Sequence, residues 1–397
     1  MTKVQDVIVV GAGPSGLIAA EAASVNGANV LVLEEHDEIG KPVNCSGVIS
    51  LSGLKQLNIN PKPRFILNKV KGANFHSPGG EHFSIEGKEA YVIDREQFDK
   101  YLAEVAIRKG TTIRTSCKVD SLMIKNRSII GVKTDKGEKI ESKVVIDAEG
   151  LSSKLLKNSN LLTPNKTGVL PAIQFEITDD NKELDFVHVF LSKRIAPGFF
   201  AWIIPINKHR TRIGLACKNG NLNDKIIFFL KNISKRYSII GVNYGSVYTS
   251  LPLSKTSYKG LLIVGDAAGQ VKATTGGGVI IGGICAEIAG TVAAEASKMN
   301  NPSLKKMRIY DTLWKNKLNR ELWTMAIARK FANLIEDKTM DKLFQIIIEN
   351  NLIKEIEREG DIDFQSQVLM KLLNDQDVRK MLFCVASDMT SKILHIQ

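Results

Sequence analysis

Two glycine-rich segments, far apart in the chain, have residue types that can bind anionic groups through their backbone. The first is the run GAGPSG at 11–16, which matches the spacing GxGxxG and follows the apolar run 6–10. In this pattern Gly11 permits a tight turn, Gly13 lets the backbone approach a pyrophosphate, and Gly16 lets a helix pack against a strand. The first N–H groups of that helix face the phosphates with the positive end of the helix dipole. The run therefore predicts a dinucleotide site.

An acidic residue stands where such a site needs one. Glu34 follows the apolar run 29–33 and lies 23 residues after Gly11. A carboxylate at that place accepts hydrogen bonds from both hydroxyls of an adenosine ribose, and it repels a 2′-phosphate, which disfavours NADP. The alternative interpretation of Glu34 is a surface carboxylate, as we expect for the neighbouring Glu35.

The second glycine-rich segment offers a different chemistry. It joins the run GDAAG at 265–269 to the run TGGG at 275–278. Gly265 lets the chain pass close to a ligand, and Asp266 can accept a hydrogen bond from a ribityl hydroxyl. The TGGG run opens a small-residue helix whose N–H groups would face the N1 and C2 carbonyl of a flavin, where the reduced ring is negative. The alternative is a flexible loop followed by a packed helix.

In this order, the two segments predict a cleft that holds FAD lengthwise. The first segment would bind the adenine half and the second the flavin half. No second GxGxxG run occurs in the sequence, so the chain lacks a dedicated nicotinamide-binding domain. Electrons would then come from ferredoxin or from transiently bound NAD(P)H.

The elements that must position these segments can be inferred from apolar periodicity. Buried-strand runs at 6–10 and 29–33, with an Ala-rich helix between them, form the first half of a dinucleotide-binding fold. The Gly-, Ser- and Pro-rich stretch 40–53 is expected to be a loop. We expect an α/β fold with α+β character. It consists of a Rossmann-like FAD-binding domain at 1–162 and 251–300, an inserted antiparallel β-sheet substrate domain at 163–250, and a C-terminal helical domain at 301–397.

Composition narrows the possible partners. The 397 residues have a net charge of +12, which favours acidic partners such as anionic lipid, nucleic acid or an acidic protein. No pattern of interleaved aromatic and basic residues indicates nucleic acid. Five widely spaced cysteines without CxxC, and six histidines without HxxxH, give no support for a disulfide framework or a metal site. We find no signal peptide and no apolar run near the roughly 18 residues that span a bilayer, so we expect a cytoplasmic protein, with the inner membrane face as a place of peripheral contact.

Three further blocks accompany the glycine segments: PVNCSG at 42–47, DREQFD at 94–99 and PGFFAWIIP at 197–205. With the run VGDAAGQVKATTGGG at 264–278, they make the chain resemble flavoproteins of the p-hydroxybenzoate-hydroxylase type. Within these it resembles the archaeal geranylgeranyl reductase family, over about residues 6–299.

The resemblance implies roles for individual residues. The expected cofactor contacts are Ser15 and Gly16 at the pyrophosphate, Glu34 at the ribose, the backbone of Val119 at adenine, Arg95 at the phosphate–ribose region, Cys45, Ser46 and Gly47 beside the isoalloxazine ring, and Asp266, Gly277, Gly278 and Val279 at the ribityl chain and flavin. Phe200, Trp202 and Pro205 belong to the block that would form an apolar substrate pocket, whereas Phe199 is expected in the ordinary core. For Arg95 the alternative is a helix-surface arginine. Two positions depart from the family: Glu149 replaces an aspartate before Gly150, and Phe200 and Ile204 replace Tyr and Phe.

The activity that the resemblance implies is FAD-dependent reduction of isoprenoid C=C bonds in the geranylgeranyl chains of archaeal membrane lipids. Reduced FAD would deliver a hydride to one alkene carbon while a proton reaches the other. Cys45 is a candidate proton donor, with a structural buried cysteine as the alternative. Cys285 is a candidate redox partner for Cys45, although isolated cysteines are more often core residues. The basic surface would favour anionic lipid, and we expect the C-terminal helices to cap the substrate tunnel.

Two alternatives stay open from the sequence. One keeps FAD but changes the chemistry, to an aromatic-ring monooxygenase or a quinone-reducing flavoprotein. The blocks around Cys45 and Trp202 argue against it. The other is a non-catalytic FAD-binding protein associated with a membrane.

Overall fold

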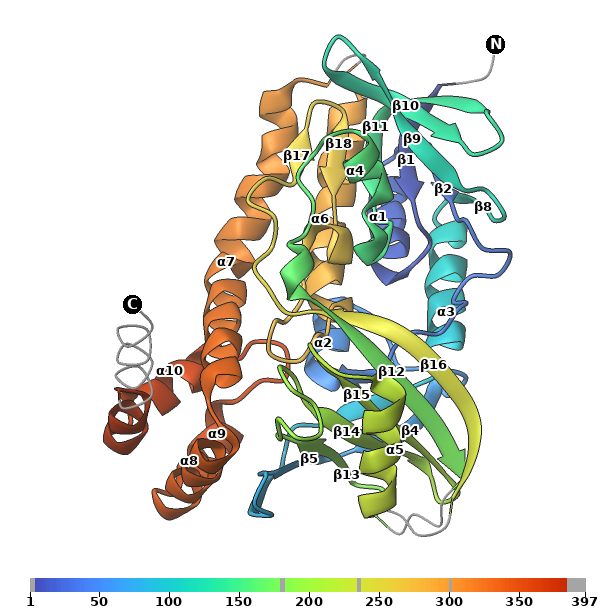
Figure 1. The fold of residues 1–397 in the computed structure, drawn as a ribbon. Helices are drawn as coiled ribbons and strands as arrows, with labels where there is room; N and C mark the ends of the chain where they lie inside the picture. The colour runs from blue at the N-terminus through green and yellow to red at the C-terminus, as the bar shows by residue number, and fades with distance from the viewer. Residues whose placement is uncertain (1–3, 179–182, 234–236, 300–301, 384–397) are drawn as a thin grey trace.

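A parallel sheet built from the apolar runs organises one half of the molecule, at the top right of Figure 1. The computed structural model describes residues 4–178, 183–233, 237–299 and 302–383. Its parallel strands are, in spatial order, β18 (Leu261–Ile263), β11 (Lys139–Asp147), β1 (Gln5–Val10), β2 (Val30–Leu33) and β8 (Thr112–Arg114). The short β17 (Ser257–Tyr258) adds an antiparallel edge.

The central parts of this sheet, at 7–10, 30–33, 144–146 and 261–263, are apolar because both of its faces are covered there. On one face, Val7 and Val9 of β1 pack with helices α1 (Pro14–Val25), α3 (Arg95–Arg108) and α6 (Val279–Ser297). On the other, Ile8 and Val10 pack against the antiparallel hairpin of β9 (Val119–Lys125) and β10 (Ser128–Thr134) and against α4 (Lys154–Asn158). The first βαβ unit therefore forms as the sequence predicts.

Helix α6 corrects the expectation that no apolar run approaches the length needed to span a bilayer. Among the described residues it is long and apolar enough to cross a membrane, with a mean hydropathy of 1.6 over its best window. However, 72% of that window is buried in the fold, against α1 and the long helix α7 (Leu304–Leu334). Its apolar composition thus reflects burial over most of its surface within the core.

A second sheet forms the lower half of the view in Figure 1. Its spatial order is β16 (Ser238–Tyr248), β12 (Val169–Thr178), β15 (Arg210–Ala216), β14 (Ala201–Asn207), β13 (Phe186–Phe190), β5 (Gly72–His76) and β6 (His82–Ile85). Helix α5 (Leu222–Ile233) covers one face. The expected antiparallel substrate sheet is present, but it is not built from 163–250 alone. Residues 72–85, which the sequence assigned to the FAD-binding domain, supply β5 and β6. β5 pairs in parallel with β13 and thereby satisfies its backbone edge, and β6 pairs antiparallel with β5.

A small third sheet corrects the expected loop at 40–53. β3 (Val48–Ser50) and β4 (Ile66–Val70) pair on either side of β7 (Ala90–Ile93), and helix α2 (Leu51–Gln56) follows β3 directly. The Ser50 hydroxyl caps α2 by accepting a hydrogen bond from the Gly53 N–H. Ser and Gly here start a helix, which the composition alone does not distinguish from a loop.

The C-terminal helices pack on both sheets, along the left side of Figure 1. Buried Tyr310 and Trp314 fix α7 beside the parallel sheet, where the Trp314 indole N–H donates to the Thr256 hydroxyl. Helices α8 (Asp337–Glu349) and α9 (Leu352–Glu359) lie against β6, where Phe344 contacts Phe83. Helix α10 (Ser366–Asn374) returns to α7. The part of the predicted helical domain at 384–397 lies outside the described residues.

Candidate active site

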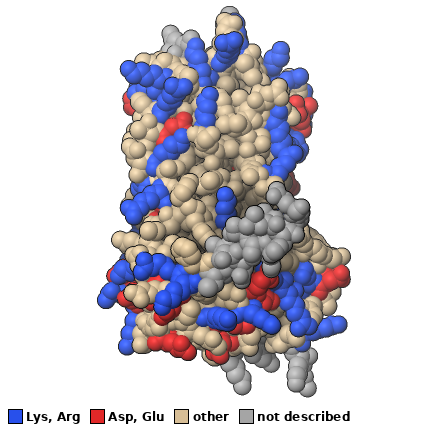
Figure 2. Space-filling model, turned by 60° about the vertical axis from the view of Figure 1, so that its left-hand side comes forward, with Lys and Arg blue, Asp and Glu red and all other residues tan. Residues whose placement is uncertain are grey.

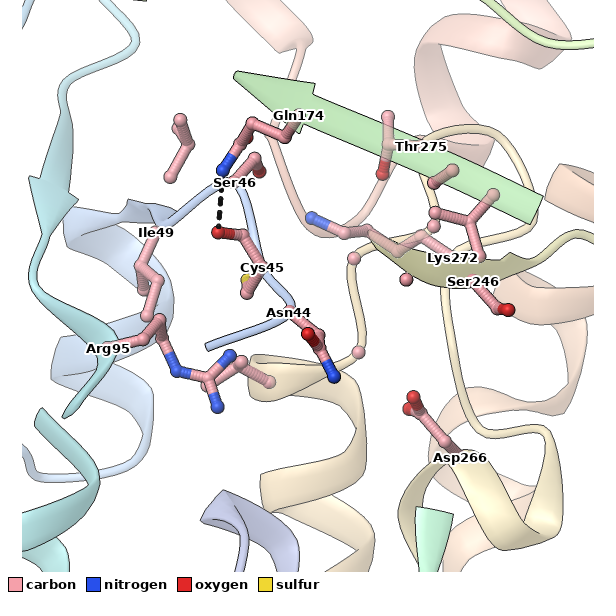
Figure 3. Close-up of a pocket in the computed structure, with 18 of the residues that line it drawn as sticks. Asn44, Cys45, Ser46, Ile49, Arg95, Gln174, Ser246, Asp266, Lys272 and Thr275 are labelled. Atoms are coloured by element: carbon pink, nitrogen blue, oxygen red, sulfur yellow. Dashed lines mark hydrogen bonds between the residues drawn. The ribbon is translucent and has the colours of Figure 1, made fainter. Parts of the chain in front are cut away.

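A cavity of about 400 Å³ lies where the parallel sheet meets the second sheet. Of the predicted contacts, Gly13, Ser15, Cys45, Ser46, Arg95, Asp266, Gly277, Gly278, Val279, Phe200 and Trp202 all line it. Gly11, Gly16, Glu34, Gly47, Val119 and Pro205 do not line it. Figure 3 shows the loop of Asn44, Cys45 and Ser46 facing Lys272 and Thr275 across the cavity, with Asp266 at its lower edge. The fold thus brings together residues from both glycine-rich segments.

The first glycine turn has the close packing that its spacing predicts. A Cβ built on Gly16 would lie 2.0 Å from the Gly11 carbonyl oxygen, so α1 can begin directly on the turn only if residue 16 is glycine. Gly11 has a φ of +97°, which an L side chain rarely adopts. In contrast, a Cβ on Gly13 would meet no atom within 4 Å and would stand in open space beside the cavity. Gly11 and Gly16 therefore shape the turn, whereas Gly13 keeps the cavity clear.

Glu34 is tied to this turn. Its Oε2 accepts a hydrogen bond of 2.7 Å from the Ala12 N–H, and its Oε1 accepts one of 3.0 Å from the His36 N–H. The Glu34 carbonyl oxygen accepts from the Cys117 N–H at 2.8 Å, two residues before Val119 at the start of β9. The Glu34 side chain is thus fixed to the turn before Gly13, and the start of β9 is joined to Glu34 through the backbone. The contacts of Glu34 with ribose and of Val119 with adenine stay predictions.

Two helix N-termini open into the cavity without a side-chain cap. Gly13 is the N-cap of α1 and Gly278 is the N-cap of α6, and neither helix receives a capping hydrogen bond from a side chain of the described residues. The first N–H groups of a helix need acceptors, and an anion satisfies them while gaining from the helix dipole. One free N-terminus suits the pyrophosphate of FAD and the other the electron-rich edge of the flavin, so these residues fit the cofactor.

Asp266 faces the cavity from the turn after β18. The described residues donate no hydrogen bond to its carboxylate, which burial keeps at a raised pKa. A Cβ on Gly278 would lie 2.6 Å from its Oδ1, so glycine at 278 leaves room for the carboxylate. The carboxylate is half-buried and lines the cavity, and a ribityl hydroxyl is a donor of the right kind for it.

Removing this carboxylate should weaken FAD binding. We expect Asp266→Ala to cost about 1–3 kcal/mol of binding free energy through the lost hydrogen bond. The measurement is the release of flavin fluorescence on dilution of the yellow protein. Asp266→Asn is the matched control, because it retains an acceptor oxygen and should lose less. Flavin release at the same dilution in the wild type and the alanine variant would contradict the assignment.

Arg95 and Cys45 lie side by side at the cavity. The Arg95 guanidinium donates to both carboxylate oxygens of Asp99, at 3.1 and 3.0 Å. Burial alone would lower the pKa of Arg95, but the Asp99 carboxylate and the Cys45 thiol outweigh it and raise that pKa above its ordinary value. Arg95 is therefore a buried, charged residue of the cavity wall and not a helix-surface arginine.

Cys285 does not join Cys45 at the site. It lies in the core between α1, α6 and α7, fully buried, and burial raises the pKa of its thiol. Cys45 lines the cavity instead, and both cysteines are free thiols. The suggested redox pair is therefore wrong for this structure, and Cys285 is a core residue.

An apolar wall closes the side of the cavity formed by the second sheet. Trp202 of β14 is held by its indole N–H, which donates to the Gln174 side chain at 3.1 Å, while the Gln174 amide donates to the Cys45 carbonyl at 3.4 Å (Figure 3). Phe199, which we expected in the ordinary core, also lines the cavity and stacks on Phe200 with ring centroids 4.2 Å apart. Pro205 lies farther along β14, outside the lining.

The structure adds two residues to the site that the sequence did not single out. The Lys272 ammonium pairs with the Asp363 carboxylate at 2.5 Å and also donates to the Ile362 carbonyl at 3.1 Å. Both side chains are buried, and Asp363 also accepts from the Ser50 hydroxyl. Lys272 lies in the run at 264–278. A lysine among the small residues of that run could have indicated a site residue. No local signal marks Asp363, because its partner is 91 residues away.

The family departure at Glu149 also has a structural explanation. Its Oε1 accepts a hydrogen bond of 2.9 Å from the Leu155 N–H, in the first turn of α4. The longer side chain thus stabilises the start of α4, while Gly150 lines the cavity.

Within the described residues, no group of three or more His, Cys, Asp or Glu side chains could hold a metal ion.

Comparison with known proteins gives two family matches. Residues 6–153 match the family described as FAD dependent oxidoreductase, and residues 169–247 match the geranylgeranyl reductase catalytic domain. Relatives named digeranylgeranylglycerophospholipid reductase match most of the chain. The one from Methanocaldococcus jannaschii is 32% identical, over 88% of this chain and 92% of the relative. The one from Methanococcoides burtonii, numbered 2, is 31% identical, over 93% and 91%.

A solved structure agrees with these matches. A geranylgeranyl bacteriochlorophyll reductase-like protein from Thermoplasma acidophilum superposes with a TM-score of 0.87 at 26% identity, over 96% of this chain and 99% of that one. The expected fold class and FAD as the cofactor are thereby confirmed. The chain belongs to the geranylgeranyl reductase family of FAD-dependent oxidoreductases.

Proposed function

We propose that this protein reduces C=C bonds in the geranylgeranyl chains of archaeal membrane lipids. One observation carries the proposal: a single cavity is bounded by the FAD-binding turns on one side and by Phe199, Phe200 and Trp202 on the other. The names of the relatives and of the matched catalytic domain support the same substrate class.

The chain's residues can do what this reaction demands. Bound in its reduced form, FAD supplies the hydride. An isolated alkene is not polarised, so the protein must fix its position and exclude water. The aromatic wall provides an apolar surface for this purpose, and the hydrogen bond from Trp202 to Gln174 holds one ring in place. Cys45 is our candidate for the group that holds the proton, because its side chain lines the same cavity.

The electron donor and the location belong to the proposal as well. Because the sequence contains no second GxGxxG, we propose ferredoxin or transiently bound NAD(P)H as the donor. A net charge of +12 favours an acidic ferredoxin. We place the protein in the cytoplasm, in peripheral contact with the inner face of the membrane.

Anaerobic turnover tests the function. The bound flavin is photoreduced and mixed with a detergent-dispersed geranylgeranyl phospholipid, and the flavin absorbance and the lipid mass are followed. We expect reoxidation together with a gain of two hydrogens for each reduced bond. A fully saturated lipid is the control and should leave the flavin reduced. The same assay with the Cys45→Ser variant tests Cys45 as the proton donor. We expect the variant to keep FAD bound and to reoxidise its flavin more slowly than the wild type.

Other outcomes would replace the proposal. A lipid of unchanged mass removes it. Rapid consumption of NAD(P)H and oxygen with a phenol would indicate a monooxygenase, and rapid reoxidation by a quinone would indicate a quinone reductase. A flavin that none of these acceptors reoxidises would indicate a non-catalytic FAD-binding protein.

A further inference from the structure

Helix α7 presents large apolar side chains to solvent along most of its length. Ile309, Leu313, Trp323, Phe331 and Leu334 are all exposed, with Trp323 accessible over 53% of its surface. At 3.6 residues per turn, these five positions fall within an arc of about 80°. They span about 38 Å along the helix axis at 1.5 Å per residue. The buried side of α7, which includes Tyr310 and Trp314, faces the core, so the exposed arc is a second apolar face.

The same outward side of α7 carries cations and no exposed carboxylate. Its exposed basic residues are Lys305, Arg308, Lys317, Arg320 and Lys330. The two acidic residues of α7 turn inward. Asp311 accepts hydrogen bonds from the backbone and hydroxyl of Thr256, and buried Glu321 accepts one of 2.7 Å from the Ser366 N–H. Figure 2 shows this side of the molecule, where Lys and Arg side chains lie beside uncharged surface.

We propose that the outer face of α7 docks on the surface of an anionic membrane, with the helix lying in the plane of the headgroups. An apolar arc bordered by lysine and arginine is the pattern of helices that lie at the membrane interface. The apolar side chains enter the boundary of the acyl chains, and the cations contact lipid phosphates. A second copy of the chain fits this face poorly, because a two-fold contact would bring its cations against their own equivalents.

The docking face is directly connected to the cavity. Buried Arg329, on the inner side of α7, donates from Nε to the Ala273 carbonyl at 3.1 Å and from its other end to the Thr274 carbonyl. Its guanidinium also lies 4.6 Å from the centre of the Phe199 ring in the cavity wall. Burial lowers the pKa of Arg329 to about 10, which still leaves it charged at neutral pH. The helix that would rest on the membrane thus contacts both the loop at 273–274 and the Phe199 ring in the cavity wall. This inference rests on the proposed lipid substrate, which a docked protein would draw from the same membrane.

Vesicle flotation with the FAD-loaded full chain tests the docking. Vesicles of phosphatidylglycerol and phosphatidylcholine are compared with vesicles of phosphatidylcholine alone. We expect binding to the anionic vesicles, a blue shift in tryptophan emission as Trp323 enters the interface, and a marked loss of binding in high salt. The variant Leu313→Gln/Trp323→Gln/Phe331→Gln should bind more than tenfold more weakly because it removes buried apolar area. Its thermal melt and FAD content should not change, since these side chains are exposed.

The matched control is Ile107→Gln/Ile124→Gln, two substitutions of equally exposed apolar residues on α3 and β9. This variant should bind vesicles like the wild type. Equal binding by the α7 variant and the wild type would overturn the proposal. So would a wild-type dimer in sedimentation that the α7 variant loses, because that result assigns the face to a second copy. Flotation does not depend on turnover, so vesicle binding without lipid reduction would contradict the proposed function and leave the docking face standing.

Discussion

Gly13→Val is expected to prevent FAD from binding at working concentrations while the apoprotein stays folded. The backbone at Gly13 has φ −74° and ψ 176°, which valine adopts without strain. Its side chain would meet no protein atom near the Cβ, and it would instead fill the part of the cavity in front of the N-terminus of α1. A pyrophosphate seated there would lose its N–H contacts and clash with the methyl groups. We expect a loss of at least about 3 kcal/mol, more than a hundredfold in Kd.

Titration of the apoprotein with FAD, followed by flavin fluorescence, gives the affinity, and a thermal melt by circular dichroism gives the stability. Gly16→Ala is the contrasting variant, since its Cβ would lie 2.0 Å from the Gly11 carbonyl. It should lower the melting temperature of the apoprotein, which Gly13→Val should not. If Gly13→Val binds FAD as tightly as the wild type does, the pyrophosphate does not sit at the N-terminus of α1.

Asp363→Asn should lower the free energy of unfolding by about 3–5 kcal/mol, because it leaves the buried Lys272 ammonium without its counter-charge. Asparagine has nearly the same shape and keeps an acceptor for the Ser50 hydroxyl, so the loss reports the charge and not a cavity. Lys272→Met/Asp363→Asn should recover much of the stability, since the buried cation is gone. Urea unfolding of the two single variants, the double variant and the wild type gives the coupling energy of the pair.

An exposed ion pair provides the control for this cycle. Lys71 and Asp185 lie 2.7 Å apart, with 64% and 49% of their side chains exposed. Asp185→Asn should therefore cost less than about 1 kcal/mol. A loss of similar size for Asp363→Asn would show that the Lys272 ammonium is solvated and does not depend on the Asp363 carboxylate.

The glycine turns and the parallel strands could be predicted from the sequence because their signals are local. β1 and β2 are continuous apolar runs, which a strand shows when it is buried on both faces. The turn at 11–16 is predictable because only glycine allows the contact between residues 11 and 16. Composition without periodicity was less informative. It predicted a loop at 40–53, where Ser50 starts a helix. It also indicated no apolar run of membrane-spanning length, although α6 has one, which is mostly buried in the core.

The sequence by itself determined FAD as the cofactor, the two glycine turns and the apolar character of the block at 197–205, since each turn and block is a short local pattern. The tertiary structure alone decided which distant segments meet. It brought β5 beside β13, Asp363 beside Lys272, and Phe199 into the cavity wall while Pro205 stayed outside it. It also showed that the described residues leave one face of α7 exposed. Periodicity shows that a side chain is buried or exposed, but the partner that buries it depends on how helices and sheets pack across the whole chain.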